Sequence, residues 1–499
     1  MLVPTYEIYS IFPETYVLLC IILLIMYGVL CSISPSLGFP VLSFNTALLC
    51  FQVVFFAMLI SLTSSDFTMF SWNQLLIHNS FTSGIKFILL ITFNFWVLLA
   101  IPYASYEKLI SFEYWILSLL ALVGMLFVIQ TCDLLSMYLS IEFQSLVFYI
   151  LASFKRTSEF STEAGLKYFI LGAFSSSLLL FGSSLLYSLT GLTNFNDYLK
   201  LIADTTFPGN GIALNYAITF AMTAVIISLL FKMSAAPFHV WSPDVYEGAP
   251  TTTTAFFSIL PKLVLLSLSL RFCFLYFYDF FYLWQNIILF CTYLSILVGT
   301  FSAFQQTKFK RFLAYSSINH VGFILLGFST GELEGTFAVL FYLITYIILM
   351  LGTFLFLTSL RYCCFPAHYQ VRYIKDLFFL SEVNPALAVS LSLLLFSMAG
   401  IPPLLGFFSK IFILLPSLQN STYSLSIFAV LMSCVSCFYY IRLIKIMYFD
   451  KTPFTNWTVS YPISNFSSIL LSLFVFLSTF LFLDLELIIL FSARLALII

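Results

Sequence analysis

The sequence predicts an all-α integral membrane protein with about 14 transmembrane helices. Of its 499 residues, 61% are hydrophobic and only 8% are charged, whereas a soluble globular chain has roughly a quarter charged residues. The apolar runs reach the length of about 20 residues that an α-helix needs to cross a bilayer. They do not alternate in polarity as the strands of a membrane barrel would, so helices are the expected spanning elements.

The apolar runs follow one another with short loops between them. Their limits predict helices at residues 14–34, 41–62, 82–103, 113–132, 134–154, 164–189, 213–236, 252–276, 280–303, 311–330, 335–360, 384–416, 424–448 and 464–485. No soluble domain separates them. The first residues lack a basic region and a small-residue cleavage site, so we expect no cleavable leader.

The basic residues of the loops fall mostly on one side of these spans. Loops after odd-numbered helices hold Lys108, Lys155, Arg156, Lys308, Lys310, Arg311, Arg361, Arg372, Lys375, Arg442, Lys445 and Lys451. The opposite side holds Lys86, Lys200, Arg271 and Arg494. Because basic loops stay on the inner side of a membrane, both termini are predicted to lie on the outer side.

Proline motifs interrupt two of the predicted spans. The seventh ends in Lys232-Met-Ser-Ala-Ala-Pro237, and the twelfth contains Gly400-Ile-Pro402-Pro403. Proline removes a backbone donor and clashes with the preceding turn, so each helix should break there. The breaks fall in the fourth member of two successive sets of five helices, helices 4–8 and 9–13. This pattern is typical of inverted repeats in transporters, and two unrelated proline kinks are the alternative.

The spans and breaks divide the chain into four predicted parts. Three N-terminal helices occupy residues 1–110, and the last helix occupies residues 451–499. Between them, residues 111–278 form the first five-helix repeat and residues 279–450 the second, inverted one.

Five charged residues lie inside the apolar runs or within their first turn: Glu142, Lys167, Lys232, Lys262 and Lys410. Such residues are expensive in a bilayer and indicate function by default. If Glu142 faces Lys232, each charge stabilises the other, and separating them favours release of the lysine's proton. Lys262 is then expected to take the proton onward, and Lys410 to mark its exit.

Other interpretations of these residues remain open. The charges can form static ion pairs that fix helix packing, although such pairs are poor stabilisers. Lys167 follows Glu163 by four residues, the spacing of an ordinary surface pair on a helix. His320 can relay protons or be a satisfied interior histidine. His239, directly after the Pro237 break, can instead bond the backbone that the break leaves unpaired.

Several classes of function are disfavoured. No GxGxxG or P-loop motif indicates a nucleotide site, and the net charge of −1 argues against nucleic acid as a partner. Cys434 and Cys437 form a lone CxxC, whereas a zinc or iron–sulfur site needs about four ligands. We interpret the two cysteines as small apolar core residues, and Asp244 and Glu247 beyond the first break as loop residues.

Specific motifs carry a resemblance. The stretch from Lys232 to Thr252, with Ala-Ala-Pro-Phe-His-Val-Trp-Ser-Pro-Asp-Val-Tyr-Glu-Gly-Ala-Pro at its centre, resembles the signature of the proton-translocating, antiporter-like membrane chains of respiratory complex I. Ala314-Tyr-Ser-Ser-Ile318 and Gly400-Ile-Pro-Pro403 are similar to two further marks of that family, as are the residues around Lys167 and Arg442.

The resemblance implies roles for individual residues. Glu142 and Lys232 match the gating pair of the family, Lys262 its central lysine, Lys410 the lysine of the twelfth helix and Lys167 that of the sixth. Each five-helix repeat is then expected to form one proton half-channel.

The resemblance also implies a setting. The resemblance implies a chain that crosses the mitochondrial inner membrane many times, with basic loops on the matrix side and both termini on the intermembrane-space side. By this resemblance, the chain is expected to move protons, while NADH, FMN, iron–sulfur clusters and ubiquinone are expected to be bound by other subunits. Expected partners are other membrane-arm and accessory subunits and membrane lipids. A secondary cation/proton antiporter is the alternative function, and a passive scaffold is a third.

Overall fold

The computed structural model describes residues 7–32, 41–63, 68–107, 109, 111–205, 212–361, 371–378, 380–450 and 463–498. Lys108 and Lys451, two of the predicted loop charges, lie outside these residues. The chain divides into two compact units, and each is described by itself. Unit 1 comprises Met1–Met233, Leu260–Asn286 and Ile498–Ile499, and unit 2 comprises Ser234–Ile259 and Ile287–Leu497.

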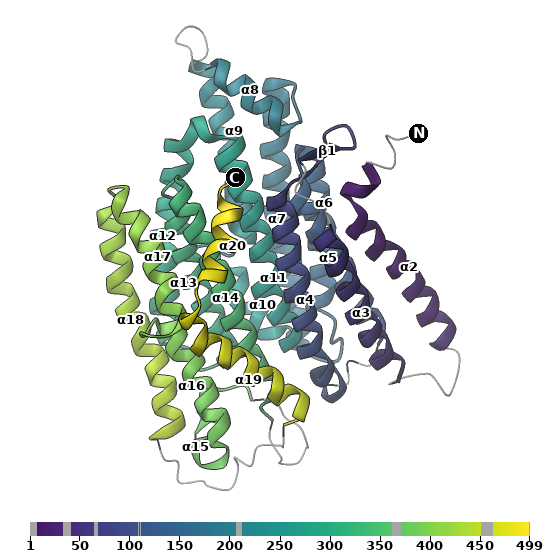
Figure 1. Ribbon diagram of the computed structural model, residues 1–499, viewed down its shortest axis with the longest axis vertical. Helices are drawn as coiled ribbons and strands as arrows, with labels where there is room; N and C mark the ends of the chain where they lie inside the picture. The colour runs from purple at the N-terminus through teal and green to yellow at the C-terminus, as the bar shows by residue number, and fades with distance from the viewer. Residues whose placement is uncertain are drawn as a thin grey trace. The chain divides into compact units, whose positions relative to one another are not determined.

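Unit 1 is built from long apolar helices and one small hairpin (Figure 1). Its helices are α2 (Phe12–Ser32), α3 (Val41–Thr63), α4 (Ser80–Tyr106), α5 (Glu113–Gln130), α6 (Leu134–Ala152), α7 (Glu159–Thr190), α8 (Phe195–Thr205), α9 (Ile212–Lys232), the C-terminal half of α11 (Thr251–Leu270), the π-helix η1 (Arg271–Tyr276) and the 3-10 turn η2 (Tyr278–Phe280). Strands β1 (Met69–Ser71) and β2 (Leu76–His78) pair antiparallel, with Phe70 opposite Ile77.

Helix α7 packs closely against α6 on one side and α9 on the other. Two glycines allow this approach. A Cβ at Gly172 would lie 2.2 Å from the Tyr149 hydroxyl of α6, and one at Gly182 would lie 2.9 Å from the Ala221 carbonyl oxygen of α9. Small residues at such contacts let membrane helices pack backbone to backbone. The packing fixes α6 and α9, which carry Glu142 and Lys232, against a common neighbour.

Two charges predicted to lie in outer loops are buried inside helices instead. Lys86 lies in the second turn of α4, and its Nζ is 2.6 Å from Oε1 of Glu14 on α2, with side chains only 1% and 0% exposed. Arg271 begins η1, is buried, and donates a hydrogen bond of 3.0 Å to the carbonyl oxygen of Thr131 after α5. Both residues already lie inside the predicted helices 82–103 and 252–276, so counting them among the loop charges was wrong.

Unit 2 is also helical (Figure 1). It contains α10 (Trp241–Gly248), the N-terminal half of α11, most of α12 (Phe281–Phe304), α13 (Phe309–Phe328), α14 (Leu333–Ser359), η3 (Ile374–Leu377), α15 (Leu380–Val383), α16 (Pro385–Ala399), α17 (Leu405–Gln419), α18 (Tyr423–Tyr448), α19 (Asn465–Phe480), η4 (Leu481–Leu483) and α20 (Glu486–Ala496). Helix α14 is almost wholly buried, because α13, α16, α17, α19 and α20 all pack against it.

Every predicted span coincides with a helix, and the all-α membrane class is confirmed. Among the described residues, 11 helices are long and apolar enough to cross a membrane. Three shorter apolar helices, Tyr216–Lys232, Pro385–Ala399 and Leu405–Gln419, occupy the predicted seventh and twelfth spans. The count of 14 and the inverted relation of the two repeats therefore stay predictions.

Both predicted breaks are present. Helix α9 ends at Lys232, and the backbone turns at Ser234, whose φ is 62°. The twelfth span is two helices: α16 ends at Gly400, which has φ 84°, and α17 starts at Leu405. A Cβ at Gly406 would lie 1.8 Å from the Ser397 carbonyl oxygen, so the two halves meet at a point where only glycine fits.

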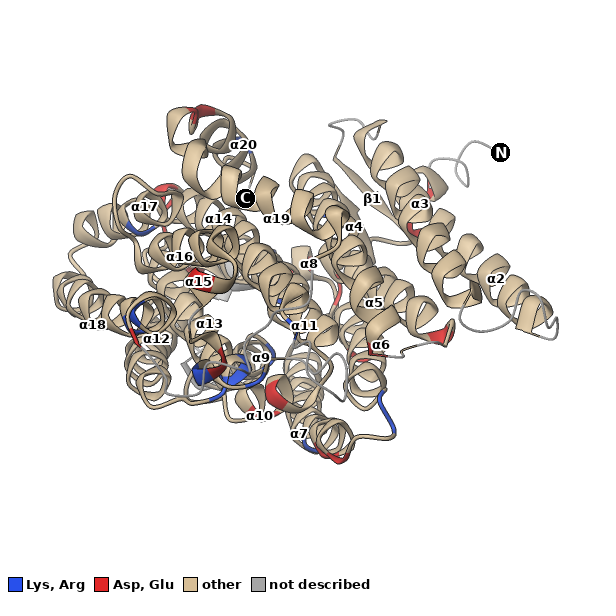
Figure 2. Ribbon diagram, turned by 90° about the horizontal axis from the view of Figure 1, so that it is seen from below, with Lys and Arg blue, Asp and Glu red and all other residues tan. Residues whose placement is uncertain are grey.

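Charged residues of unit 2 gather beside α10 (Figure 2). Asp244 and Glu247 belong to this short helix, so their assignment to a loop was wrong. Lys308, just before α13, pairs with Glu247, and Arg311 pairs with Asp244 and, at 2.9 Å, with Glu247. Lys310 donates to the Ala249 carbonyl oxygen at 2.8 Å. The acids after the first break thus hold α10 against α13.

Candidate functional site

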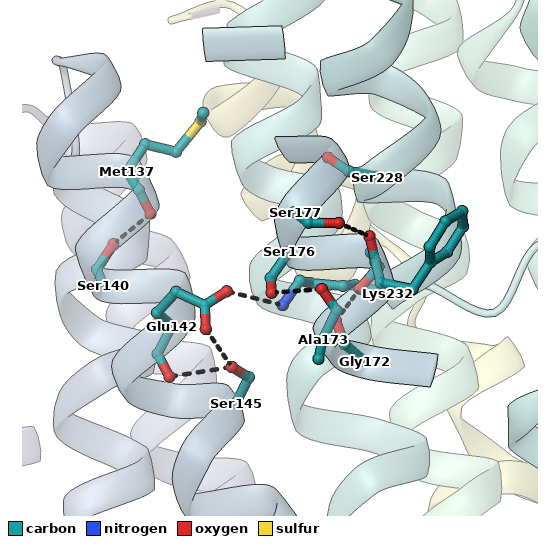
Figure 3. A network of polar contacts seen from close by, with 12 residues as sticks. Met137, Ser140, Glu142, Ser145, Gly172, Ala173, Ser176, Ser177, Ser228 and Lys232 are labelled. Carbon is teal, nitrogen blue, oxygen red and sulfur yellow. Dashed lines mark hydrogen bonds and ion pairs between the residues drawn. The ribbon is translucent and has the colours of Figure 1, made fainter. Parts of the chain in front are cut away.

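Glu142 occupies the middle of α6, the helix that starts directly after Asp133. The Asp133 side chain accepts a hydrogen bond from the Leu135 backbone N–H and so caps the helix. Figure 3 shows Glu142 reaching from α6 toward Lys232, which is the last residue of α9. The two side chains meet within unit 1, as the sequence predicts.

The pair is loose. Lys232 Nζ lies 3.9 Å from Glu142 Oε1, at the limit of an ion pair, and the side chains are 10% and 22% exposed. On the other side of the carboxylate, the Ser145 hydroxyl lies 3.5 Å from Oε2 and donates at 3.0 Å to the Glu142 carbonyl oxygen. A carboxylate with two long contacts is held less firmly than one in a tight bond, because the attraction falls with distance.

Lys232 lies at a helix end. The last carbonyls of a helix have no intrahelical partner and carry partial negative charge, which favours a cation there. Because the chain turns directly afterwards at Ser234, the end of α9 is not continued by another helical turn. The lysine is therefore placed where a small rotation of the helix end changes its distance from Glu142.

Lys262 is buried in the middle of α11. It follows Pro261 inside the helix and is 2% exposed. Proline removes one N–H from the backbone, and the Phe257 carbonyl oxygen that this N–H would bond accepts a hydrogen bond of 3.2 Å from the Tyr246 hydroxyl instead. The helix brings the lysine to the same unit as Lys232, since both belong to unit 1.

Lys410 lies beside the second break, in the second turn of α17. Its Nζ donates a hydrogen bond of 2.7 Å to the carbonyl oxygen of Ala399, the last residue of α16. The break at Gly400 frees this oxygen, and a Cβ on Gly400 would lie 3.1 Å from the lysine nitrogen. The break and the lysine therefore belong together: one supplies the acceptor, the other the charge that a helix C-terminus favours.

His320 is buried in α13 of unit 2. Its Nδ1 lies 2.7 Å from the hydroxyl oxygen of Tyr342 on α14. This ring nitrogen therefore has a hydrogen-bond partner, and the same contact is short enough for proton transfer. His239 lies in the first break, close to the Pro237 backbone. Its predicted hydrogen bond to the broken backbone stays a prediction.

Lys167 has a different environment. Its Nζ lies 2.8 Å from Oε1 of Glu163, four residues earlier on α7, and the two side chains are 43% and 61% exposed. This is the helix-surface pair that the spacing indicates. Cys434 on α18 is also exposed, so its assignment to the core was wrong, and Cys437 is half-buried.

The arrangement is suited to moving protons between buried amines. A lysine amine can hold or release one proton, and a nearby carboxylate favours the charged form. The sequence did not single out the tyrosines around His320, because nothing local distinguishes them from the other tyrosines of the chain.

The chain is similar in sequence to a known protein family over the region that contains this site. The family described as NADH:quinone oxidoreductase/Mrp antiporter matches residues 131–436, a range that contains Glu142, Lys232, Lys262, His320 and Lys410. The chain belongs to this family. The match also covers both broken helices, so the site lies in the part of the chain that defines the family.

Individual members are similar over most of their length. NADH-ubiquinone oxidoreductase chain 2 of Marchantia polymorpha is 42% identical over 480 residues, 96% of each chain. NADH-quinone oxidoreductase subunit N of Paramagnetospirillum magneticum is 41% identical over 381 residues, 76% of this chain and 77% of the relative. A chain of respiratory complex I from Thermus thermophilus shares the fold, with a TM-score of 0.76, 24% identity and coverage of 96% and 99%.

Proposed function

We propose that the chain is a proton-translocating membrane subunit of NADH:ubiquinone oxidoreductase, of the chain 2 type found in plants and algae. Relatives with the name NADH-ubiquinone oxidoreductase chain 2 are 39% to 42% identical over nearly the whole chain. The observation that carries the proposal is the loose Glu142–Lys232 contact of 3.9 Å inside an apolar protein. Such a pair is stable enough to form and weak enough to open.

The proton path begins at this pair. When Glu142 moves away, Lys232 loses the charge that favours its protonated form and releases its proton. Lys262 receives the proton in the low-dielectric interior, and Lys410 passes it toward the other side with His320 as a relay. Lys167, which matches the sixth-helix lysine of the family by resemblance, pairs with Glu163 at the exposed surface and so stands at the margin of the path.

The energy comes from redox chemistry elsewhere in the complex. The chain contributes proton transfer only, so NADH, FMN, iron–sulfur clusters and ubiquinone are bound by other subunits. Its partners are the other membrane-arm and accessory subunits and the surrounding lipids.

The location follows from the same assignment. The chain crosses the mitochondrial inner membrane many times, with the basic loops on the matrix side. Both termini are on the intermembrane-space side, as the distribution of loop charges favours.

Replacing Lys232 tests the function. In the assembled enzyme, we expect Lys232→Met to lower the number of protons translocated per NADH oxidised, because the path loses its first amine. Lys200→Met is the control, since Lys200 pairs with Asp197 on α8 and is 76% exposed. A wild-type proton yield in Lys232→Met would exclude the function proposed here.

The antiporter alternative is tested in the same preparation. A secondary antiporter would move protons in exchange for sodium or potassium without NADH. We expect proton movement to require NADH and to continue in vesicles that contain neither cation. Exchange driven by a sodium gradient alone would favour the alternative.

A further inference from the structure

Four buried tyrosines of unit 2 form a cluster in which three lie beside His320 and the fourth, Tyr439, lies beside Tyr440, and the Glu142–Lys232 pair does not explain them. Tyr342 and Tyr346 come from α14, Tyr439 and Tyr440 from α18, and each is at most 2% exposed. Buried hydroxyl groups are nearly always hydrogen-bonded, because an unpaired one is costly in an apolar interior. Their partners therefore indicate why four such groups are kept here.

Two of the tyrosines flank the imidazole. The Tyr342 hydroxyl oxygen lies 2.7 Å from Nδ1, and the Tyr440 hydroxyl oxygen lies 3.4 Å from Nε2. A neutral imidazole donates from one ring nitrogen and accepts at the other. With a hydroxyl on each side, one hydroxyl can give a proton to one ring nitrogen while the other hydroxyl takes a proton from the second ring nitrogen.

The polar chain continues beyond Tyr440. Tyr439 is the preceding residue in the chain, and the two tyrosine rings lie 4.4 Å apart, centroid to centroid. The Asn319 side-chain amide donates to the Tyr439 hydroxyl at 3.4 Å. Hydrogen-bonding groups thus run from α18 through the histidine of α13 to Tyr342 on α14.

The chain of direct contacts ends at Phe323. The rings of Phe323 and Tyr342 are stacked with centroids 6.3 Å apart, and Lys410 Nζ lies 5.4 Å from the Phe323 centroid. A phenyl ring has no group that can carry a proton. A step from Tyr342 to Lys410 therefore needs a water molecule beside Phe323.

We propose that Tyr440 and Tyr342 are proton-relay residues on the two sides of His320, an assignment that rests on the proposed function. A proton that reaches the Tyr440 oxygen displaces the hydroxyl's own proton onto Nε2. Nδ1 then passes its proton to the Tyr342 oxygen, and Tyr342 releases its original proton. No bond between heavy atoms changes, and rotation of the hydroxyls with a change of tautomer restores the start.

The long Tyr440 contact is the controlling step of the relay. At 3.4 Å it is weaker than the 2.7 Å bond to Tyr342, and catalytic hydrogen bonds are often long until the working state forms. A small shift of α18 against α13 closes or opens it.

Removal of single hydroxyl groups tests the relay in the assembled enzyme. Tyr342→Phe and Tyr440→Phe keep the rings and their packing. We expect each to lower protons translocated per NADH as far as Lys232→Met does, and the double variant no further, because the groups act in series. Tyr346→Phe is the matched control: it is equally buried and lies beside His320, but its hydroxyl donates to the Ser258 carbonyl oxygen at 3.0 Å.

The outcomes separate this relay from the function on which it rests. Normal proton yield in Tyr342→Phe and Tyr440→Phe, with a reduced yield in Lys232→Met, overturns the relay alone. A normal yield in all three overturns the function as well. Losses that add up in the double variant, or an equal loss in Tyr346→Phe, indicate packing and also overturn the relay. Native gels report assembly, and if Tyr342→Phe assembles poorly, Tyr440→Phe carries the test.

Discussion

Two lysine–glutamate ion pairs of unit 1 differ in how close and how buried their members are. Lys86 and Glu14 are 2.6 Å apart and 1% and 0% exposed, whereas Lys232 and Glu142 are 3.9 Å apart and 10% and 22% exposed. Removing one member of a tight, buried pair leaves a charge without compensation. The first pair is therefore structural, joining α2 to α4, and the second is free to change.

Removing one member of the tight pair is expected to destabilise the chain, and removing the second member as well is expected to restore most of the stability. Lys86→Met should destabilise the chain by about 3–5 kcal/mol, because Glu14 is left charged and buried. The double variant Glu14→Leu with Lys86→Met should recover most of that loss, since an apolar pair replaces the ionic one. The yield of assembled enzyme and its thermal denaturation midpoint measure both. A double variant no better than the single one would contradict this interpretation.

His78 on β2 should make this part of the chain sensitive to acid. Burial, and then the charge of Lys86, lower the pKa of His78 from 6.5 to about 4. The unfolded chain binds the proton near pH 6.5, so the stability due to the neutral ring is complete above that pH and is lost as the pH falls toward 4.

Between pH 7 and pH 5 this loss amounts to about 2 kcal/mol. We expect His78→Gln to have a thermal midpoint that falls less steeply over this range than that of the wild type. Equal slopes for the two proteins would show that His78 is not the responsible group.

At the level of single residues, the sequence reveals charges more readily than hydroxyl groups. Lys232, Lys262 and Lys410 stand out because a charge in an apolar run is rare. The chain has 29 tyrosines, and no local signal marks the two whose hydroxyl groups contact the His320 ring nitrogens. The Glu14–Lys86 contact was missed for a related reason, because both residues lie near the ends of apolar runs and resemble solvent-facing flanks.

Among the helices, the broken pair α16 and α17 has the clearest consequence. Gly400 ends α16, and Gly406 lets the first turn of α17 approach the Ser397 carbonyl oxygen. The break frees the Ala399 oxygen that holds Lys410. Position and charge of this lysine therefore depend on the geometry of the break.

Gly406→Ala tests that dependence. Its methyl group would lie 1.8 Å from a backbone oxygen, so α17 must shift and carry Lys410 with it. We expect a lower proton yield per NADH together with destabilisation of about 1–3 kcal/mol, the usual range for overpacking. Gly191→Ala is a control for packing, because no atom lies within 4 Å of a Cβ there, although its φ of 71° adds some strain. An unchanged proton yield in Gly406→Ala would show that proton transfer through Lys410 does not depend on the geometry of the break.

The elements themselves follow closely from local signals. Each apolar run became a helix, and each proline cluster became a break, because both effects act over a few residues. The short helix α10 was missed because Pro243 and Gly248 are typical of loops. Its two acids pair with Lys308 and Arg311, which come from a distant part of the sequence.

For the whole molecule, the proposed function requires other chains. The described residues hold amines, a histidine and hydroxyl groups, the chemistry of proton transfer. We expect the chain, when extracted in mild detergent, to migrate with flavin- and iron–sulfur-containing subunits, and NADH oxidation to follow that assembly. Isolation of a chain that transports ions without such subunits would contradict the assignment.

The central claim is that opening and closing of the Glu142–Lys232 pair controls proton transfer. Protons translocated per NADH by the assembled enzyme carrying Glu142→Gln test it most directly, with Asp197→Asn in the exposed Lys200–Asp197 pair of α8 as the control. A neutral amide cannot hold the lysine in its charged form, so we predict a reduced yield in Glu142→Gln and a normal one in the control. A normal yield in both would contradict the claim.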